Sequence, residues 1–143
     1  EQKWDCDLKT SYNLTSNILN VIELRPLKFN ILSHIDNYMF QTEKFYDGYI
    51  YNSWINIYEK NYYQEFHTHV HDIYKGISGV VYLTEKNSNI IFDTHHAKSF
   101  SPEFSEIIIF EDDMHHRVKS NEEELRISLA FNYVKCMPWT GIK

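Results

Sequence analysis

The rhythm of hydrophobic and polar positions changes near residue 48 of this chain. From Pro26 onwards, apolar residues recur at helical spacing, at Leu27, Ile31, Leu32, Ile35, Tyr38 and Met39. Proline suits the first turn of a helix, because the N–H group that it lacks has no intrahelical partner there. The pattern predicts one helix over roughly residues 26–41.

Beyond Tyr49, short apolar runs alternate with polar segments. The runs are rich in β-branched and aromatic residues: YIYNSWINIY, ISGVVYLT, NIIFD, EIIIF, HRVK and LRISLAFNYV. Segments such as TEKNSN and KSNEEE separate them, a rhythm typical of an all-β sandwich or barrel. The 4 glycines are few for so many turns, so we expect Asn and Asp residues at some left-handed turn positions. The predicted fold is mainly β with an N-terminal helix.

Length and composition indicate one globular domain. The chain has 143 residues, of which 43% are hydrophobic and 16% aromatic, enough to bury a core. No internal repeat or linker interrupts it. We predict a single domain over residues 1–143, in which residues 1–48 form a supporting strand and helix and residues 49–135 form the β core. The sequence starts at Glu1 rather than at Met, so we expect further residues upstream.

The charge and the cysteines indicate which cellular compartment and which kinds of partner to expect. The formal net charge is −6 and no run of Lys and Arg forms a basic stripe, so nucleic acid is not indicated as a partner. Cys6 and Cys136 lack CxxC spacing, which suits a reducing compartment and ferrous iron. No stretch approaches the roughly 18 apolar residues of a membrane span, and the N-terminus lacks signal-peptide regions. We expect a cytoplasmic protein with no membrane partner.

The stretch FHTHVHD, residues 66–72, holds three histidines and an aspartate. On a β-strand, residues i and i+2 face the same side, so His67 and His69 would converge on one ion. A catalytic metal usually takes about three protein ligands and keeps further positions for water or substrate. Another part of the chain must therefore supply the third ligand.

Four later histidines are candidates for that ligand. His95 and His96 directly follow an apolar run, so we expect them in a turn. In HHRVKS, apolar Val118 should face inward, and alternation then places His116 inside and His115 outside. His116 is the predicted third ligand. A single histidine is more often a hydrogen-bonded surface or core residue, but the pairing of HxH with a distant inward histidine argues against that interpretation.

Arg126 lies in ELRISLAFN, a strand that is otherwise apolar on both faces. A guanidinium buried there needs an anionic partner, either an internal carboxylate or the carboxylate of a bound acid, and the strand alone favours neither. Ser128 shares its face and could donate a second hydrogen bond. In SWINIYE, Asn56 and Tyr58 share one face with Trp54, where core side chains would be expected. On their own they would be read as a satisfied polar pair.

Taken together, these motifs resemble a known family. The segment SWINIYEKNYYQEFHTHVHDIYKGISGVVYL, followed by IIFD, FEDDMHHRVKSN and LRISLAFNY, is similar to short 2-oxoglutarate/iron(II)-dependent oxygenases of marine bacteria and their phages. The likeness covers most of the chain, including KWDCDLKTSYN and the helix after it. It implies a double-stranded β-helix, the jelly-roll fold of cupin-like and prolyl-hydroxylase-like enzymes. An iron site between the sheets and a 2-oxoglutarate pocket beside it would come with that fold.

The resemblance also implies roles for particular residues. In prolyl-hydroxylase-like and DNA-dealkylating relatives a tyrosine stands nine positions before the first metal histidine, as Tyr58 does before His67. Asn56 completes the Asn-x-Tyr motif that touches 2-oxoglutarate in the dealkylating group. A basic residue about ten positions after the distal histidine grips the far carboxylate in that family. Arg126 lies ten positions after His116 and opens the matching Arg-x-Ser pattern.

The metal motif departs from the family pattern. The usual triad is His-x-Asp plus a distant histidine, but His69 occupies the aspartate position. Three neutral ligands leave more positive charge on the metal, which would strengthen binding of dianionic 2-oxoglutarate or signal another chemistry. Asp72 lies three residues beyond His69, so a loop would have to bring it to the metal instead. FEDDMHH also lacks the expected Pro-Ser, and Asn61 stands where relatives often have glycine.

Three functions remain open at this point. The leading one is a dioxygenase that uses Fe(II) and 2-oxoglutarate to hydroxylate an unidentified small-molecule or peptide substrate, releasing succinate and CO2. A three-histidine cupin enzyme that does not use 2-oxoglutarate fits the histidines equally well, and a non-catalytic jelly-roll binding module is the third. The sequence is also compatible with a homodimer. The predicted catalytic and metal residues are His67, His69 and His116, and the predicted 2-oxoglutarate residues are Arg126, Ser128, Asn56 and Tyr58.

Overall fold

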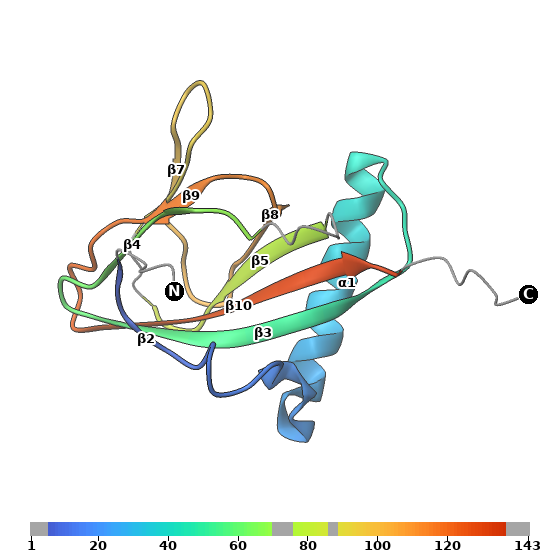
Figure 1. Ribbon diagram of the computed structural model, residues 1–143, viewed down its shortest axis with the longest axis horizontal. Coiled ribbons are helices and arrows are strands. Elements are labelled where there is room, and N and C mark those ends of the chain that lie inside the picture. The colour runs from blue at the N-terminus through green and yellow to red at the C-terminus, as the bar shows by residue number, and fades with distance from the viewer. Residues whose placement is uncertain (1–5, 70–75, 86–88, 137–143) are drawn as a thin grey trace, which may run out of the picture.

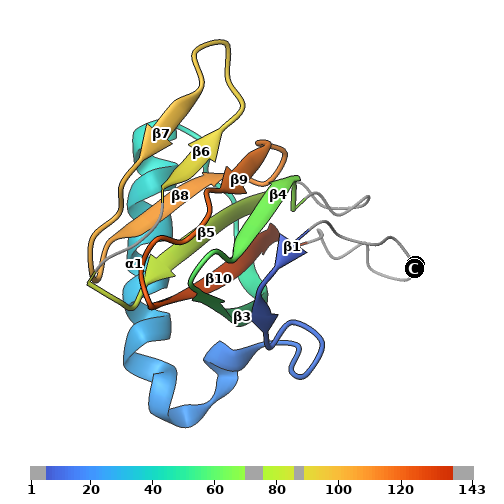
Figure 2. The ribbon, with the colours of Figure 1, turned by 90° about the vertical axis from the view of Figure 1, so that its left-hand side faces the viewer.

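Two antiparallel β-sheets face each other, and one helix covers the outer face of the larger sheet (Figures 1 and 2). This computed structural model describes residues 6–69, 76–85 and 89–136. The smaller sheet has the strand order β1-β4-β9-β6-β7, and the larger sheet has the order β2-β3-β10-β5-β8. Most consecutive strands switch between the sheets, as in a jelly roll, whereas β2 and β3 share the larger sheet and β6 and β7 share the smaller one. The prediction of a mainly β, double-stranded β-helix fold with an N-terminal helix is confirmed.

The predicted apolar runs all become strands. The larger sheet consists of β2 (Lys9–Thr10), β3 (Gly48–Glu59), β10 (Leu125–Lys135), β5 (Gly76–Tyr82) and β8 (Ile107–Glu111). The smaller sheet consists of β1 (Cys6–Asp7), β4 (Tyr63–His67), β9 (His116–Val118), β6 (Ile90–Phe92) and β7 (Lys98–Phe100). A supporting strand was predicted within residues 1–48 but its position was not, and β7 was not predicted, because β1, β2 and β7 are too short and polar to produce a hydrophobic period.

The helix lies where the apolar spacing predicts it. Helix α1 spans Arg25–Thr42, with proline in its first turn, and two short 3-10 helices, η1 (Ile18–Asn20) and η2 (Ile22–Leu24), precede it. Glu43 caps its C-terminus, because a left-handed φ of 56° lets the N–H group of Glu43 donate to carbonyl oxygens of the last turn. One face buries Ile31, Ile35 and Met39 against the larger sheet. This contact holds the sheet from outside and leaves its inner face for the site.

Strand β10 is central to the larger sheet, between β3 and β5, and almost all of it is buried. Leu129, Phe131 and Tyr133 alternate toward the helix and join its hydrophobic cluster. The residues between them face the smaller sheet. Pairing with β3 and β5 arranges these inward side chains in rows, which are Tyr58 with Arg126, Asn56 with Ser128 and Tyr82, Trp54 with Ala130 and Val80, and Asn52 with Asn132 and Ser78.

An asparagine takes the left-handed position in the turn between β3 and β4. Asn61 has a φ of 70°, and its N–H group donates to the carbonyl oxygen of Asn121 over 2.7 Å. Asparagine tolerates this conformation better than most residues with a side chain. Asn61 therefore meets the expectation that asparagine takes some left-handed turn positions in this glycine-poor chain, while Glu43 and Ser105 take the other two among the described residues.

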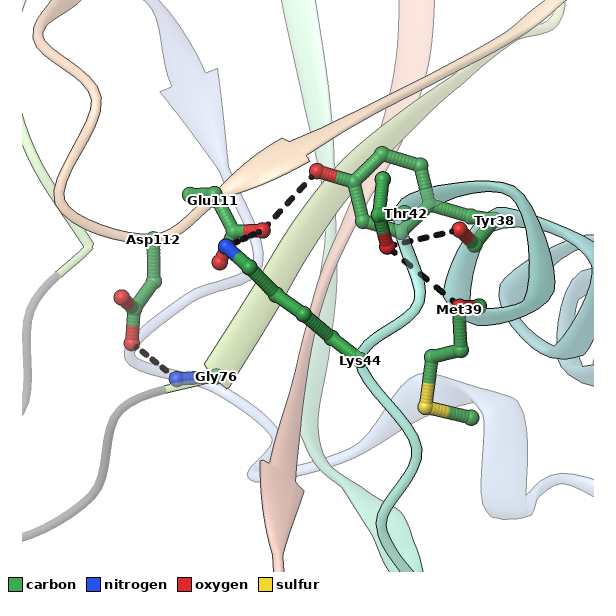
Figure 3. A network of polar contacts seen from close by, with 7 residues as sticks. All are labelled: Tyr38, Met39, Thr42, Lys44, Gly76, Glu111 and Asp112. Atoms are coloured by element: carbon green, nitrogen blue, oxygen red, sulfur yellow. Dashed lines mark hydrogen bonds and ion pairs between the residues drawn. The ribbon is translucent and has the colours of Figure 1, made fainter.

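The end of β8 ties the helix to the sheets (Figure 3). Tyr38 donates its hydroxyl hydrogen to Oε1 of Glu111 over 3.1 Å, and Lys44 pairs with the same oxygen over 3.1 Å. Burial, together with the charge of Glu111, raises the pKa of Tyr38 to about 12, so this hydroxyl remains a donor at neutral pH. Next to it, the buried Asp112 accepts a hydrogen bond from the N–H group of Gly76 over 2.7 Å. No helix among the described residues is long and apolar enough to cross a membrane.

Candidate metal centre

Three histidines meet between the two sheets. The possible ligand atoms of His67, His69 and His116 all lie within 4.8 Å of one another. The ring centroids are 4.2 Å apart for His67 and His116, 4.9 Å for His69 and His116, and 5.1 Å for His67 and His69. The residues that the sequence singled out as metal ligands are thus brought to one point, and their part in metal binding stays a prediction.

Two neighbouring strands supply His67 and His116. His67 is the last residue of β4 and pairs directly with His116, the first residue of β9. The side chain of His116 is buried whereas His115 and Arg117 are exposed, as the alternation in HHRVKS predicts. His95 and His96 lie in an exposed turn, also as expected.

His69 reaches the cluster from outside the strand. We expected His67 and His69 on the same face of one regular strand, but β4 ends at His67. The pairing of β4 with β9 is irregular between Gln64 and His67, and the N–H group of His69 instead donates to the carbonyl oxygen of Asp112 over 2.9 Å. His69 is therefore positioned by a backbone hydrogen bond to Asp112, just after β8, and not by pairing within β4. Asp72, the alternative ligand, lies outside the described residues.

All three imidazole rings are oriented by an oxygen at Nδ1. The partners are the carbonyl oxygen of Glu65 for His67 at 2.8 Å, that of Met114 for His116 at 3.0 Å, and Oδ1 of Asn132 for His69 at 2.9 Å. A carbonyl oxygen only accepts hydrogen bonds, so Nδ1 carries the proton in each neutral ring. The lone pair of each ring then sits on Nε2, the atom that a metal would use.

The Nε2 atoms of His67 and His69 are only 3.2 Å apart. With both protons on Nδ1, two lone pairs face each other, and a cation between them would remove the repulsion. Two nitrogen ligands at about 2.1 Å from a metal and at right angles to each other would be about 3.0 Å apart. The observed separation therefore fits two neighbouring positions in the coordination sphere of one ion.

Burial keeps two of these histidines neutral. It lowers the pKa of His67 and, together with the nearby His67 and His69, lowers the pKa of His116 to about 2. Both rings are therefore unprotonated at neutral pH, which is the state that binds a metal.

Asn132 orients His69 and is a residue that the sequence did not single out. Its Oδ1 also accepts the hydroxyl hydrogen of Ser78 over 2.7 Å, and its Nδ2 donates to Oδ1 of Asn52 over 2.8 Å. Three neighbouring strands thus hold this amide in one orientation. The signal was present in LRISLAFNYV, since Asn132 lies six residues after Arg126 and so on the same strand face.

We predict that Asn132→Ala weakens metal binding about 10- to 100-fold, the usual effect of losing the oxygen that orients a metal-binding histidine. Competition titration of Co(II) against a chelator measures this change. Asn56→Ala is the matched control, because Asn56 is a similarly buried asparagine on the same sheet face that has no hydrogen bond to a histidine among the described contacts. Equal losses in the two variants would show a general disturbance of the fold instead.

A buried arginine lies in the same cavity as the histidines. Arg126 is 1% exposed, and its guanidinium carbon lies 4.5 Å from the ring centre of Tyr58 and 5.3 Å from that of Tyr82. Its Nε and Nη1 atoms have no hydrogen-bond partner among the described residues, and neither has the hydroxyl of Tyr82. Neither ion pair found in the described part of the chain includes it. Contact with the aromatic rings offsets only part of the cost of burying this charge, so its N–H groups favour a bound anion.

One narrow cavity joins the arginine to the histidines. Its volume is about 20 Å³, room for one or two water molecules, so a larger ligand must displace side chains. Gln64 is a partly exposed lining residue whose Oε1 accepts a hydrogen bond from the hydroxyl of Tyr58 over 3.0 Å. All the predicted site residues line this cavity, namely His67, His69, His116, Arg126, Ser128, Asn56 and Tyr58. Gln64 and Tyr82 are lining residues that the sequence did not indicate.

Comparison with protein-family models and with curated proteins found no match. Among solved structures, a Pseudomonas putida prolyl-4-hydroxylase is similar with a TM-score of 0.67 and 12% identity, over 96% of this chain and 76% of that one. The 2OG complex of the viral collagen prolyl hydroxylase from Paramecium Bursaria Chlorella virus-1 also has a TM-score of 0.67 and 12% identity, over 92% of this chain and 80% of that one.

A third similar structure is an oxidoreductase of the 2OG-Fe(II) oxygenase family from Burkholderia pseudomallei. Its TM-score is 0.57 at 19% identity, and the match covers 62% of this chain and 46% of that one. This chain therefore spans less than half of the Burkholderia protein. At such identities the likeness establishes the architecture. The chain has the double-stranded β-helix fold that prolyl hydroxylases and 2OG-Fe(II) oxygenases share.

Proposed function

We propose that this protein is a 2-oxoglutarate- and Fe(II)-dependent oxygenase of the short type found in marine bacteria and phages. The observation that carries the proposal is that one cavity contains both a cluster of three imidazoles and a buried arginine whose Nε and Nη1 have no hydrogen-bond partner in the described part of the chain. His67, His69 and His116 would hold the iron. Arg126 would bind the far carboxylate of 2-oxoglutarate, with Ser128 on the same strand face.

The donor set suits ferrous iron. Imidazole nitrogen is a common ligand of iron, and a site with three protein ligands would leave the metal open to further ligands. Because all three ligands are neutral, the iron would keep its full double positive charge, and Arg126 adds one more. That excess of positive charge suits a dianion. Iron, when bound, would couple the oxidative decarboxylation of 2-oxoglutarate by O2 to hydroxylation of a substrate C–H bond: one oxygen atom of O2 enters succinate, the other enters the product, and CO2 is released.

The chain's own residues position these groups and exclude water. Trp54, Val80, Ile90 and Ala130 give the cavity apolar walls, and in such surroundings the attraction between a guanidinium and a carboxylate is stronger than in water. The oxygen atoms at the three Nδ1 positions keep the rings aimed at one point. These three hydrogen bonds to the imidazoles are present without a ligand. Metal binding would therefore spend little free energy on ordering the rings.

Arg126 separates this proposal from the three-histidine cupin. Adding 2-oxoglutarate to the metal-loaded wild type under anaerobic conditions should raise its thermal midpoint, since a ligand at about 100 times its Kd stabilises the native state by about 2.7 kcal/mol. Arg126→Met should lose that increase. Differential scanning fluorimetry measures both midpoints, and succinate release measures turnover. We expect Arg126→Met to fold, because removing an unpaired buried charge in favour of an apolar side chain of similar length is rarely costly.

The control for this experiment is Arg117→Met, which changes an exposed arginine outside the cavity and should keep the full increase. A full increase in Arg126→Met would contradict the role of Arg126 and favour either the cupin alternative or a different group that binds the anion. If neither the wild type nor any variant retains metal, a non-catalytic module is the better description.

A further inference from the structure

A second, larger cavity lies on the other side of Trp54. Its volume is about 300 Å³, and its lining residues are Tyr12, Thr15, Ser16, Tyr51, Asn52 and Trp54. Cavities that bind small molecules begin at about this size. The metal cavity, at about 20 Å³, offers no comparable space. The larger cavity is therefore the better candidate for recognising a substrate.

Hydrogen bonds fix both walls of this cavity. One wall is β3, and the other is the segment that links β2 to η1. The N–H group of Ser11 donates to the carbonyl oxygen of Ile55 over 3.0 Å, and the N–H group of Ile55 donates to Oγ of Ser11 over 2.9 Å. At the other end of the segment, the N–H group of Ser53 donates to the carbonyl oxygen of Ser16 over 3.4 Å. The cavity is thus formed in the absence of a ligand.

Two contacts connect the cavity to the histidine cluster. The ring of Trp54 lines both cavities, and its centroid lies 5.0 Å from that of Tyr12 and 5.6 Å from that of His69. Asn52 accepts the hydrogen bond from Asn132, the residue that orients His69. A ligand in the larger cavity would therefore lie one indole ring away from a predicted metal ligand.

The lining indicates the chemistry of the ligand. It consists of three aromatic residues, the hydroxyl residues Thr15 and Ser16, and one amide, and none of these side chains is charged. Aromatic faces carry negative charge density and attract the C–H groups of a saturated ring. Hydroxyl and amide groups exchange hydrogen bonds with ring hydroxyls. Because none of these six side chains is charged, the lining would not stabilise an ionised ligand.

We propose that this cavity binds a neutral sugar unit, which is the recognised part of the substrate of the oxygenase. The inference that the sugar is part of a substrate rests on the function proposed above. The sugar ring lies between the tyrosines and Trp54, and Thr15, Ser16 and Asn52 bind its hydroxyl groups. The group to be oxidised extends past the indole toward the metal.

Saturation-transfer NMR with methyl β-D-glucopyranoside, methyl β-D-galactopyranoside and N-acetylglucosamine tests the site on the metal-free protein. We expect transfer to the ring protons of at least one sugar, and a loss of at least fivefold in Tyr12→Ala and Tyr51→Ala. Tyr49→Ala is the matched control. Tyr49 lies on the same strand as Tyr51 and is 49% exposed against 48%, but it does not line the cavity. Glucuronate, the charged counterpart, should show weaker transfer.

A second measurement tests the link to the metal. Proton relaxation of the bound sugar is compared between protein loaded with Mn(II) and protein loaded with Zn(II). Paramagnetic relaxation falls steeply with distance, so sugar protons held beside Trp54 should relax faster in the Mn(II) form.

Three results would overturn the proposal. They are no transfer to any neutral sugar, transfer that survives in both tyrosine variants, and binding without faster relaxation in the Mn(II) form. Failure to load either metal would instead contradict the proposed oxygenase function, and the saturation-transfer result on the metal-free protein would still decide whether the sugar site exists.

Discussion

His116→Ala abolishes the binding of a divalent ion, whereas His115→Ala leaves one ion per chain. This is the largest effect that we expect. The two residues are neighbours, but His116 is 3% exposed and lies with the other two imidazoles, while His115, just before the strand, is exposed. Losing one of three ligands should weaken binding at least 100-fold. Metal analysis after anaerobic loading with Fe(II) measures the stoichiometry, and circular dichroism checks the fold.

The pH dependence of the same titration provides a control. Imidazole must be unprotonated to bind a metal, so affinity should fall on acidification. Because burial lowers the pKa of His67 and His116 in the folded protein, their unfolded counterparts bind protons first, below about pH 6.5. The metal-free fold should therefore become less stable as the pH drops below that value.

If His115→Ala rather than His116→Ala releases the metal, the assignment of inward and outward faces is wrong.

His69→Asp retains measurable metal binding and 2-oxoglutarate turnover, whereas His69→Ala loses most of both. Aspartate at this position would restore the usual set of two histidines and one carboxylate. Alanine supplies no ligand atom, and the orienting oxygen of Asn132 would be left without its partner at Nδ1. Iron content and succinate release, measured on both variants, test the expectation. The size of the difference should approach that expected for His116→Ala.

Asp72 offers the contrasting outcome for this experiment. If Asp72→Ala removes the iron while His69→Ala retains it, the carboxylate is the ligand and His69 only supports the site. Measuring the two variants side by side with the wild type separates these cases, because each assignment requires one variant to lose iron and the other to keep it.

Local patterns in the sequence predict much of this fold. Helical spacing from Pro26 predicts α1 to within one residue at each end, and strand alternation places Arg126 and His116 on inward faces. Such features depend on neighbours a few residues apart, so the chain reveals them directly. The same alternation indicates the face that carries Asn132. A buried asparagine becomes significant only when its partner is known, and His69 is 63 residues away in the sequence.

Contacts between distant segments explain what the sequence did not predict. His69 leaves the strand because its N–H group bonds to Asp112, and no local periodicity encodes a bond between those two positions. Strand β2 forms because Lys9 and Thr10 pair with Ile57 and Asn56 near the end of β3, although no hydrophobic pattern surrounds them. The larger cavity likewise forms between two segments, one before and one after α1 in the sequence. Neither segment alone indicates a cavity.

Asp112 has a consequence for how this scaffold can diversify. Its backbone oxygen holds the N–H group of His69, and its carboxylate holds that of Gly76. The described residues on either side of positions 70–75 are thus both hydrogen-bonded to a single residue. Insertions between these two anchors would cost little closure entropy and would leave the imidazole of His69 in place. Changes in length between positions 69 and 76 would therefore leave the three-histidine cluster intact.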